Sequence, residues 1–366
     1  MYMMLRRRYM LPQKSNEGKA ITIYDIAKEA EVSPSTVSRV LTNSARVRPE
    51  KRQKIEALIA KYNFKPNALA KGLADTRTRT IGVLAADIRN PYYASLFVAC
   101  EQAAKEVGYT VVLYNTLGKT ENEVELLGKL QEQKVDAIIQ LGGRADDLVS
   151  SAEYVEIINE IMSSIPVVVT GKLDGTRCHA VRIDSMKSME LLMEHLLGLG
   201  HRRIALIGGR RNVLATFEKY QKYKLMLKEN MIAYDDGLVA PDGGYDFETG
   251  YRQMNEMLAK RTDMTAVIAI NDFAAMGVMK SLNEHGIRIP EDMSVVSYDN
   301  TYMSEMAMPR LTSIDYNFGE YGRKLIDTSI AVIEGRKKDN LRMVMPAIVV
   351  RESSGPCRVG ALGKSF

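Results

Sequence analysis

The sequence predicts a small all-α helix-turn-helix domain followed by a larger α/β domain with parallel sheets. Two observations lead to this prediction. Residues 1–79 hold 17 Lys and Arg against 7 Asp and Glu, a charge of +10, whereas the rest of the 366 residues holds 33 against 38. From residue 81 onward, apolar runs alternate with longer stretches of helical periodicity. We therefore expect a basic module that binds a polyanion, joined to a mildly acidic body with another task.

The composition excludes several classes of protein. No apolar run is long enough to cross a bilayer, so we expect no membrane partner. Cys100, Cys178 and Cys357 lie far apart and show no paired spacing, which favours a reducing compartment. Residues 1–20 are basic but lack the apolar core of a signal peptide. We expect a cytoplasmic protein that begins with a flexible basic arm.

Three short helices follow the arm. Apolar residues from Ile23 to Ala30 have helical spacing, and Thr22 with Asp25 forms a weak capping box. A tight turn separates them from Ser33, an N-cap that precedes a proline at the favoured first position of a second helix. The third helix is expected over residues 49–62. This succession over residues 21–64 is a helix-turn-helix arrangement.

The second helix has an unusual outward surface. Its outward residues are small or polar apart from one arginine: Pro34, Ser35, Thr36, Ser38 and Arg39. Small side chains allow the backbone close to the floor of the DNA major groove, and Arg39 can make a bidentate contact with guanine. The alternative is a three-helix bundle that binds protein, which the local charge disfavours.

The chain resembles the LacI/GalR, or lactose-repressor, family of bacterial transcription regulators. The resemblance runs from about residue 21 to 354 and rests on ITIYDIAKEAEVSPSTVSRVLTN, VRPEKRQKIEALIAKYNFKPNALAKGL and RTRTIGVLAADIRNPYY. It implies operator contacts by the outward residues of the second helix and by Tyr24, which we place at the end of a strand-like N-terminal segment. Two residues depart from the pattern: Glu31 replaces a turn glycine, which strains the turn if φ is positive there, and Thr42 replaces asparagine.

The family's hinge helix corresponds to residues 65–73 within a hinge and linker of residues 65–79. On its own this segment is too short to be a stable helix. The resemblance implies that two hinges pack in the minor groove, where Leu73 is the wedge between base steps and Asn67 and Ala70 line the groove. A plain flexible linker is the alternative.

The body from residue 80 reads as repeated strand–helix units. The buried-strand runs are IGVLAA, YTVVLYN, VDAIIQLG, PVVVTG, RIALIGG, TAVIAIN and MSVVSYD. By resemblance this is a two-lobed, periplasmic-binding-protein-like domain over residues 80–354, with three crossovers between its lobes. We expect lobe one to comprise 80–183 with 315–339 and lobe two 184–314 with 340–354, followed by a flexible tail, 355–366.

Polar and aromatic residues at the carboxyl ends of the strands predict a ligand site between the lobes. The expected effector-binding residues from these positions are Asp87, Tyr92, Tyr93, Asn271, Asp299, Tyr316 and Phe318, and the family resemblance adds Lys219 and Tyr245. Asp272 and Asn300 have a simpler interpretation as helix N-caps, and we expect this role for Asp272.

Two positions of this site differ from the family pattern. Lys219 stands where an arginine usually forks onto sugar hydroxyls, and Gly171 replaces an acid that often follows the fourth strand. An ordinary monosaccharide is therefore in doubt, and a charged ligand, a larger glycoside, a non-sugar or no small ligand remain open.

No spacing of residues predicts catalysis, a cofactor or a metal site, so we expect neither an enzyme nor a cofactor. We expect the protein to be a sequence-specific DNA-binding regulator. The resemblance implies a repressor, because most members of the family are repressors. It would act as a homodimer on a palindromic operator under a sugar-like effector. One alternative is control by a protein co-regulator with a vestigial cleft. The other is a solute-binding protein, which the basic N-terminal module disfavours.

Overall fold

The computed structural model describes residues 21–42, 47–64, 77–261, 263–336 and 339–357. The chain divides into two compact units, Met1–Thr76 and Arg77–Phe366. The expected arm, the hinge with Asn67, Ala70 and Leu73, and most of the tail lie outside the described residues. Each unit is described by itself.

Residues 21–42 and 47–64, the described part of the N-terminal unit, form three helices: α2 Ile23–Ala30, α3 Pro34–Thr42 and α4 Pro49–Lys61. They bury one shared apolar core of seven residues: Ile26, Ala27, Ala30, Val37, Val40, Ile55 and Leu58. Glu29 of α2 also accepts hydrogen bonds from the Lys61 ammonium at 2.7 Å and the Tyr62 hydroxyl at 2.6 Å. The second helix is thus held by packing against a braced pair, as a helix-turn-helix requires.

Helix α2 has the predicted residues at both of its ends, with one correction for Tyr24. Thr22 and Asp25 form the capping box, so α2 begins at Ile23 and Tyr24 lies inside the helix rather than at the end of a strand-like segment. Glu31 ends α2 in the left-handed conformation, with φ 57°. The expected strain at this former glycine position is therefore present.

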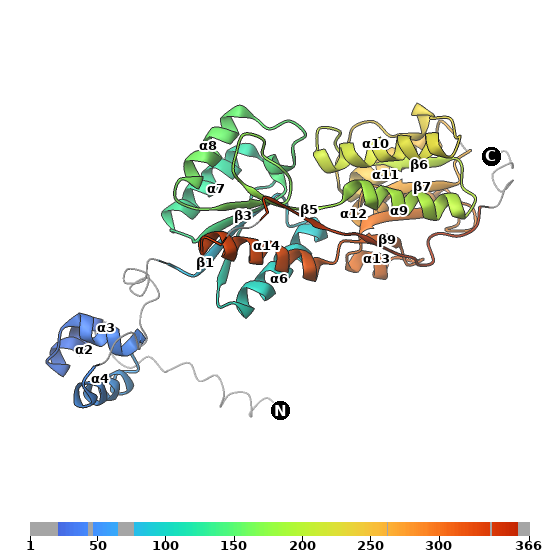
Figure 1. Cartoon of the computed structure of the whole chain (residues 1–366). Helices are drawn as coiled ribbons and strands as arrows, with labels where there is room; N and C mark the ends of the chain where they lie inside the picture. The colour runs from blue at the N-terminus through green and yellow to red at the C-terminus, as the bar shows by residue number, and fades with distance from the viewer. Residues whose placement is uncertain (1–20, 43–46, 65–76, 262, 337–338, 358–366) are drawn as a thin grey trace, which may run out of the picture. The chain divides into compact units, whose positions relative to one another are not determined.

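The larger unit folds into two α/β lobes (Figure 1). The sheet of lobe one has the strand order β10-β5-β4-β3-β1-β2, and all its pairings are parallel. Its strands are β1 Thr80–Ala85, β2 Thr110–Asn115, β3 Ala137–Leu141, β4 Val167–Val169, β5 His179–Ile183 and β10 Leu341–Val344. The helices are α6 Pro91–Glu106, α7 Thr120–Glu132, α8 Ala152–Met162 and α14 Phe318–Ile333, with a 3₁₀ turn η1 Gly143–Asp146. Separate cores on its two faces contain residues of α6 and α14 and residues of α7 and α8.

The sheet of lobe two has the order β11-β9-β8-β7-β6, in which only β11 is antiparallel. Its strands are β6 Ile204–Ile207, β7 Ala266–Ala269, β8 Ser294–Asp299, β9 Thr312–Asp315 and β11 Ala347–Val349. The helices are α9 Ser185–Gly198, α10 Leu214–Glu229, α11 Phe247–Leu258, α12 Asp272–Glu284 and α13 Tyr302–Met306, with a 3₁₀ turn η2 Asp236–Leu238. Two cores again flank the sheet.

The third crossover differs from the expected boundary. Strand β10 pairs with β5 in lobe one, so residues 341–344 belong to that lobe and not to lobe two, and the chain crosses between Val344 and Ala347. Strand β10 is an edge strand that begins at an exposed residue and contains the charged Arg342. Its sequence therefore lacks the unbroken apolar run that predicts a buried strand. The first two crossings follow β5 and β9, close to the expected positions.

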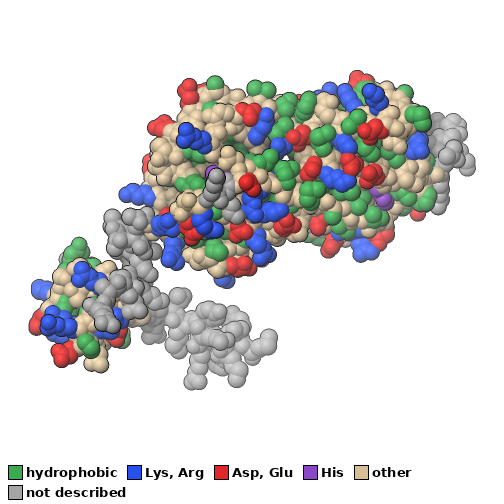
Figure 2. All heavy atoms as spheres, viewed as in Figure 1, with side chains coloured by type: hydrophobic (Ala, Val, Ile, Leu, Met, Phe, Trp, Pro, Cys, Tyr) green, Lys and Arg blue, Asp and Glu red, His purple; other side chains and the backbone are tan. Residues whose placement is uncertain are grey.

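Within the part of the chain that the structure describes, no helix is long and apolar enough to cross a membrane. On the face shown in Figure 2, acidic and basic side chains are interspersed over the larger unit. The face in view thus lacks the single-sign field of a polyanion-binding surface.

Candidate DNA interface and effector cleft

Six of the nine predicted DNA-contacting residues are described: Tyr24 is in α2, Pro34, Ser35, Thr36 and Ser38 are in the first five positions of α3, and Arg39 is in its last turn. Tyr24 is 70% exposed, Ser35 and Arg39 are exposed, and Pro34, Thr36 and Ser38 are half-buried. The Ser33 hydroxyl lies 2.8 Å from that of Ser35 and 2.9 Å from that of Thr36. Arg39 makes no ion pair with any residue the structure describes. Its guanidinium is therefore available for an external acceptor.

A cleft of about 780 Å³ lies between the two lobes of the larger unit. Eight of the nine predicted effector-binding residues line it: Asp87, Tyr92, Tyr93, Lys219, Tyr245, Asn271, Asp299 and Tyr316. Phe318 does not line the cleft, because it begins α14 and packs into the core of lobe one. Its ring centroid lies 5.7 Å from that of Tyr92.

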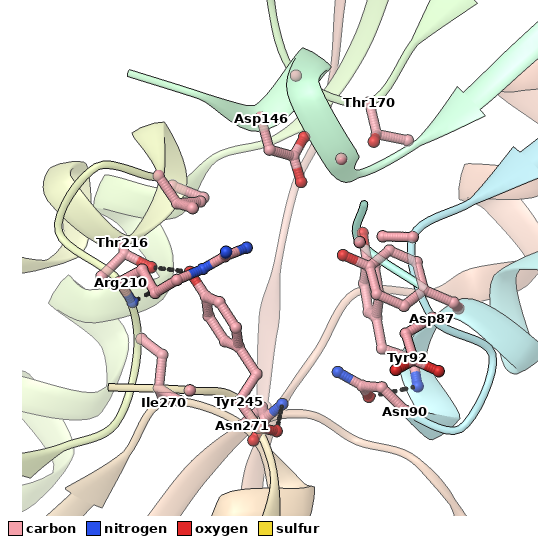
Figure 3. A pocket seen from close by; sticks show the side chains of 18 of the residues that line it. Asp87, Asn90, Tyr92, Asp146, Thr170, Arg210, Thr216, Tyr245, Ile270 and Asn271 are labelled. Carbon is pink, nitrogen blue, oxygen red and sulfur yellow. Dashed lines mark hydrogen bonds between the residues drawn. The ribbon is translucent and has the colours of Figure 1, made fainter. Parts of the chain in front are cut away.

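Tyr92 is the centre of an aromatic wall. Its ring meets Tyr93 at 5.0 Å and Tyr316 at 6.1 Å between centroids, both edge to face. Asn90 caps α6 by accepting a hydrogen bond from the backbone N–H of Tyr92, which fixes the start of the helix below the rings (Figure 3). The wall offers a stacking face to a ring-shaped ligand.

Lys219 and Asp299 are the buried charged groups at the lobe-two side of the cleft. Lys219 is 7% exposed, its ammonium lies 3.8 Å from the centroid of Tyr298, and it donates to the Tyr316 hydroxyl at 3.3 Å. Burial lowers the pKa of Lys219 to about 8, against the pull of Asp299. Burial raises the pKa of Asp299 well above its ordinary value, and Asp272 raises it further. The two groups form no direct ion pair, so each can still meet a polar group of a ligand.

Asp272 is not the N-cap that we expected. The cap of α12 is Asn271, whose side chain accepts from the N–H of Ala274 at 2.8 Å and donates to the carbonyl of Tyr245 at 2.9 Å. Asp272 instead accepts from Ser297, Ser313 and Thr301 in the interior. Asn300, the other expected cap, precedes Thr301, the N-cap of α13. Asp272 therefore braces the turn in which Asp299 adopts φ 99°.

Several lining residues were not predicted. Asp146 of η1, Thr170 after β4, Arg210 after β6 and Thr216 of α10 line the cleft, and Figure 3 shows Asp146 and Arg210 on opposite sides of it. The unpredicted Arg182 of β5 lines it as well. Asp146 and Arg210 belong to turns whose direction is set by packing, and no motif in the sequence marks them.

The lobes touch directly at the cleft. Arg182 of lobe one donates to both carboxylate oxygens of Glu218 of lobe two at 2.7 and 2.8 Å. The backbone N–H of Leu148 donates to the carbonyl of Asn212 at 2.7 Å. These contacts bind lobe one to the start and first turns of α10.

The described residues contain no group of three or more His, Cys, Asp or Glu side chains placed to hold a metal ion. Cys100, Cys178 and Cys357 are free thiols.

A helix-turn-helix unit joined to a two-lobed α/β unit with a cleft defines a DNA-binding transcriptional regulator. Comparison with known families agrees. Residues 22–67 match the bacterial regulatory proteins of the lacI family, and residues 193–354 match a periplasmic binding protein-like domain. The chain belongs to the lacI family of bacterial regulators, whose members found by comparison are transcription factors and not enzymes.

The relatives cover almost the whole chain. Catabolite control protein A of Staphylococcus epidermidis is 35% identical over 311 residues, which are 84% of this chain and 91% of that protein. Its counterpart in Staphylococcus xylosus is 34% identical over 312 residues, with the same coverage.

Solved structures with the same fold include the Lac repressor dimer bound to operator and the anti-inducer ONPF. Its TM-score is 0.81 at 26% identity, over 92% of this chain and 100% of that one. The complex of the transcriptional regulator CelR with cellobiose has a TM-score of 0.67 at 27% identity, over 91% of this chain and 100% of that one.

Proposed function

We propose that this chain is a cytoplasmic, homodimeric repressor whose operator binding is controlled by a small molecule held between the lobes. The observation that carries the proposal is the cleft of about 780 Å³, which residues of both lobes line. The same polypeptide chain also contains the helix-turn-helix unit. A ligand that binds one degree of lobe closure better than another shifts the population of closed molecules. That shift is the signal that would reach the DNA-binding units.

The cleft supports a sugar-like effector. It offers an aromatic wall together with buried acceptors and donors, and its volume lies within the range of pockets for small organic ligands. Among the structural relatives, CelR is in complex with cellobiose and the Lac repressor dimer is bound to ONPF. Polar side chains from both lobes line this volume, which supports a working effector site over a vestigial cleft in a protein controlled by a co-regulator.

In the N-terminal unit, we assign base reading to the exposed side chains of α3. Arg39 and Ser35 supply exposed hydrogen-bonding groups for the bases. We assign a contact with the DNA backbone to the exposed Tyr24 of α2. Outside the described residues, Leu73 is assigned the wedge in the minor groove, with Asn67 and Ala70 beside it. Leu73→Ala should reduce specific binding and DNA bending far more than nonspecific binding.

A homodimer is supported by exposed apolar side chains along one edge of the larger unit. Met306 and Met308, in and after α13, are 74% and 94% exposed, and Val98 of α6 is 47% exposed. Helices α6 and α13 both lie on the lower edge in Figure 1, one in each lobe. A second copy would cover these side chains, and the Lac repressor relative is a dimer. Met308→Glu should shift the protein toward monomers in analytical ultracentrifugation.

The test is a selection of duplexes from a random library, followed by titration with sugars. Enrichment of a near-palindromic sequence, with its release or tightening by a sugar that binds the protein, is the expected result. No preference over random competitor at moderate salt would refute the DNA-binding function itself. Selection of an operator without a response to any sugar would favour the protein co-regulator.

A further inference from the structure

Most of the cationic side chains that line the cleft are neutralised within the protein, whereas the lining residues Asp146, Asp246, Glu248 and Asp299 make no ion pair with a described residue. Three guanidinium groups are already engaged by carboxylates: Arg89 by Asp87 at 2.6 Å, Arg144 by Asp147 at 2.9 Å and Arg182 by Glu218 at 2.7 Å. Among the described residues, Arg210 and Lys219 make no ion pair. Arg210 is the exposed one of these two cations, and it comes from lobe two.

Arg210 is held so that its guanidinium points into the cleft. Its carbon Cζ lies 5.8 Å from the centroid of the Tyr245 ring. The Tyr245 hydroxyl is bonded to the Thr216 hydroxyl at 2.7 Å and accepts from the backbone N–H of Arg210 at 3.4 Å. Figure 3 shows the Arg210 side chain extending over this ring toward the open space, opposite Asp146.

Asp146 reaches the cleft because Gly171 makes room for its turn. A Cβ atom on Gly171 would lie 1.9 Å from the carbonyl oxygen of Ala145 and 2.6 Å from Oδ1 of Asp146. The N–H of Lys172 also donates to the carbonyl of Ala145 at 2.7 Å, which binds η1 to the segment after β4. The carboxylate of Asp146 thus occupies the region next to position 171, where this sequence has no side chain.

The environment of Asp146 favours a hydroxyl as its partner. Burial raises the pKa of Asp146 to about 6, with Asp147 raising it and Arg182 and Arg210 lowering it. The carboxylate therefore accepts hydrogen bonds near neutral pH in a partly desolvated position. An anionic group could pair with Arg210 but would be repelled by Asp146, and an ammonium could pair with Asp146 but would be repelled by Arg210. Two neighbouring hydroxyl groups can bind both residues without such repulsion.

We propose that Asp146 and Arg210 form a cross-cleft pair that determines effector specificity by binding neighbouring hydroxyl groups of an uncharged ligand. Asp146 accepts from one hydroxyl and Arg210 donates to the next, so a single ligand edge bridges lobe one and lobe two. This inference rests on effector control as proposed above. It adds two specificity-determining residues, and it excludes phosphorylated and amino sugars from the preferred effectors.

The experiment uses the full-length protein and a fixed panel of glucose, maltose, cellobiose, lactose, glucose 6-phosphate and glucosamine. Affinities are measured by isothermal titration calorimetry for the wild type, Asp146→Asn, Arg210→Gln and the double variant. Glu153→Gln, an exposed glutamate at the start of α8, controls for the loss of one negative charge from lobe one. Operator binding and thermal unfolding without sugar are recorded for every variant.

A neutral sugar of the panel should bind best. Each single substitution should weaken its binding roughly ten-fold or more, because a hydrogen bond to a charged group is lost. The double variant should lose less than the product of the single losses, since one ligand edge links both residues. Glu153→Gln should bind like the wild type.

Three results would overturn the proposal: unchanged affinity in Asp146→Asn, tighter binding of glucose 6-phosphate or glucosamine than of glucose, or no binding by any member of the panel. In each of them an intact operator complex would leave the DNA-binding function standing. If the wild type did not bind an operator at all, the proposed function itself would be refuted.

Discussion

Arg182 and Glu218 form an ion pair between the two lobes, with Nη2 of the arginine 2.7 and 2.8 Å from the two carboxylate oxygens. Both side chains are largely shielded, at 16% and 24% exposed. The pair joins β5 to α10 beside the cleft, and it can form only when the lobes are this close. It therefore contributes to the free energy of the closed arrangement.

A double-mutant cycle of Arg182→Gln and Glu218→Gln should show a coupling energy of about 1 kcal/mol in urea unfolding, because the shielded pair is stronger than an exposed one. Small-angle scattering should show a wider separation of the lobes in either single variant. Glu194→Gln, on the exposed side of α9, is the control for charge. Strictly additive single effects would mean that the pair does not stabilise closure.

Glu31→Gly should stabilise the N-terminal unit. Glu31 has φ 57° and ψ 45°, a conformation that costs a residue with a Cβ atom about 1 kcal/mol or more. Glycine removes that cost but gains entropy in the unfolded chain, so the net increase in unfolding free energy should be roughly 0.5 kcal/mol. Hydrogen exchange of the backbone amides of α2, α3 and α4 in the full-length protein measures it. Glu31→Ala keeps a Cβ atom, and an equal gain from alanine would contradict the strain.

Arg39→Ala should weaken binding to the selected operator by about ten-fold or more, because a good bidentate contact to a base contributes about 1–3 kcal/mol. The melting temperature should hardly change, since the exposed side chain makes no ion pair with a described residue. Fluorescence anisotropy with operator and with random duplex separates the two kinds of binding. Equal losses on both duplexes would indicate a phosphate contact, and a large fall in melting temperature would indicate a structural residue.

The strands and cleft were predictable to the extent that they depend on unbroken apolar runs. Strands such as β1 and β8 are buried on both faces, so their sequences show them, and the residues that end them, such as Asp299, lie in the cleft as expected. Strands β5 and β10 were missed because edge or half-buried strands admit Arg182 and Arg342. Asp146 was missed for another reason: its position depends on contact between η1 and Gly171, which are 25 residues apart.

Glu123 should make the stability of lobe one depend on pH. Its side chain is 2% exposed, and burial raises its pKa from 4.5 to about 7, although the backbone N–H of Arg144 opposes the rise. The folded state therefore binds more protons than the unfolded state between these values, and the free energy of unfolding should fall as pH rises from about 4.5 to 7. The shift corresponds to up to about 3 kcal/mol.

Glu123→Gln should remove this part of the pH dependence, so the variant gains on the wild type between pH 4.5 and 7.5. Urea unfolding at a series of pH values measures the difference. Glu125→Gln, on the exposed side of the same helix, accounts for the loss of a surface charge. A difference between Glu123→Gln and wild type that stays constant over this range would show that Glu123 titrates normally.

Gly171→Ala should destabilise lobe one by roughly 1–3 kcal/mol, the usual cost of overpacking. The new Cβ atom would lie 1.9 Å from the carbonyl oxygen of Ala145, and backbone cannot yield as a flexible side chain does. The turn η1 must then move, which also displaces Asp146 from the cleft. Gly128→Ala is the matched control, because nothing lies within 4 Å of a Cβ atom there and the position is inside α7. It should stabilise by about 0.5–1 kcal/mol. Thermal unfolding compares the two variants, and a neutral or stabilising Gly171→Ala would refute the requirement for glycine beside η1.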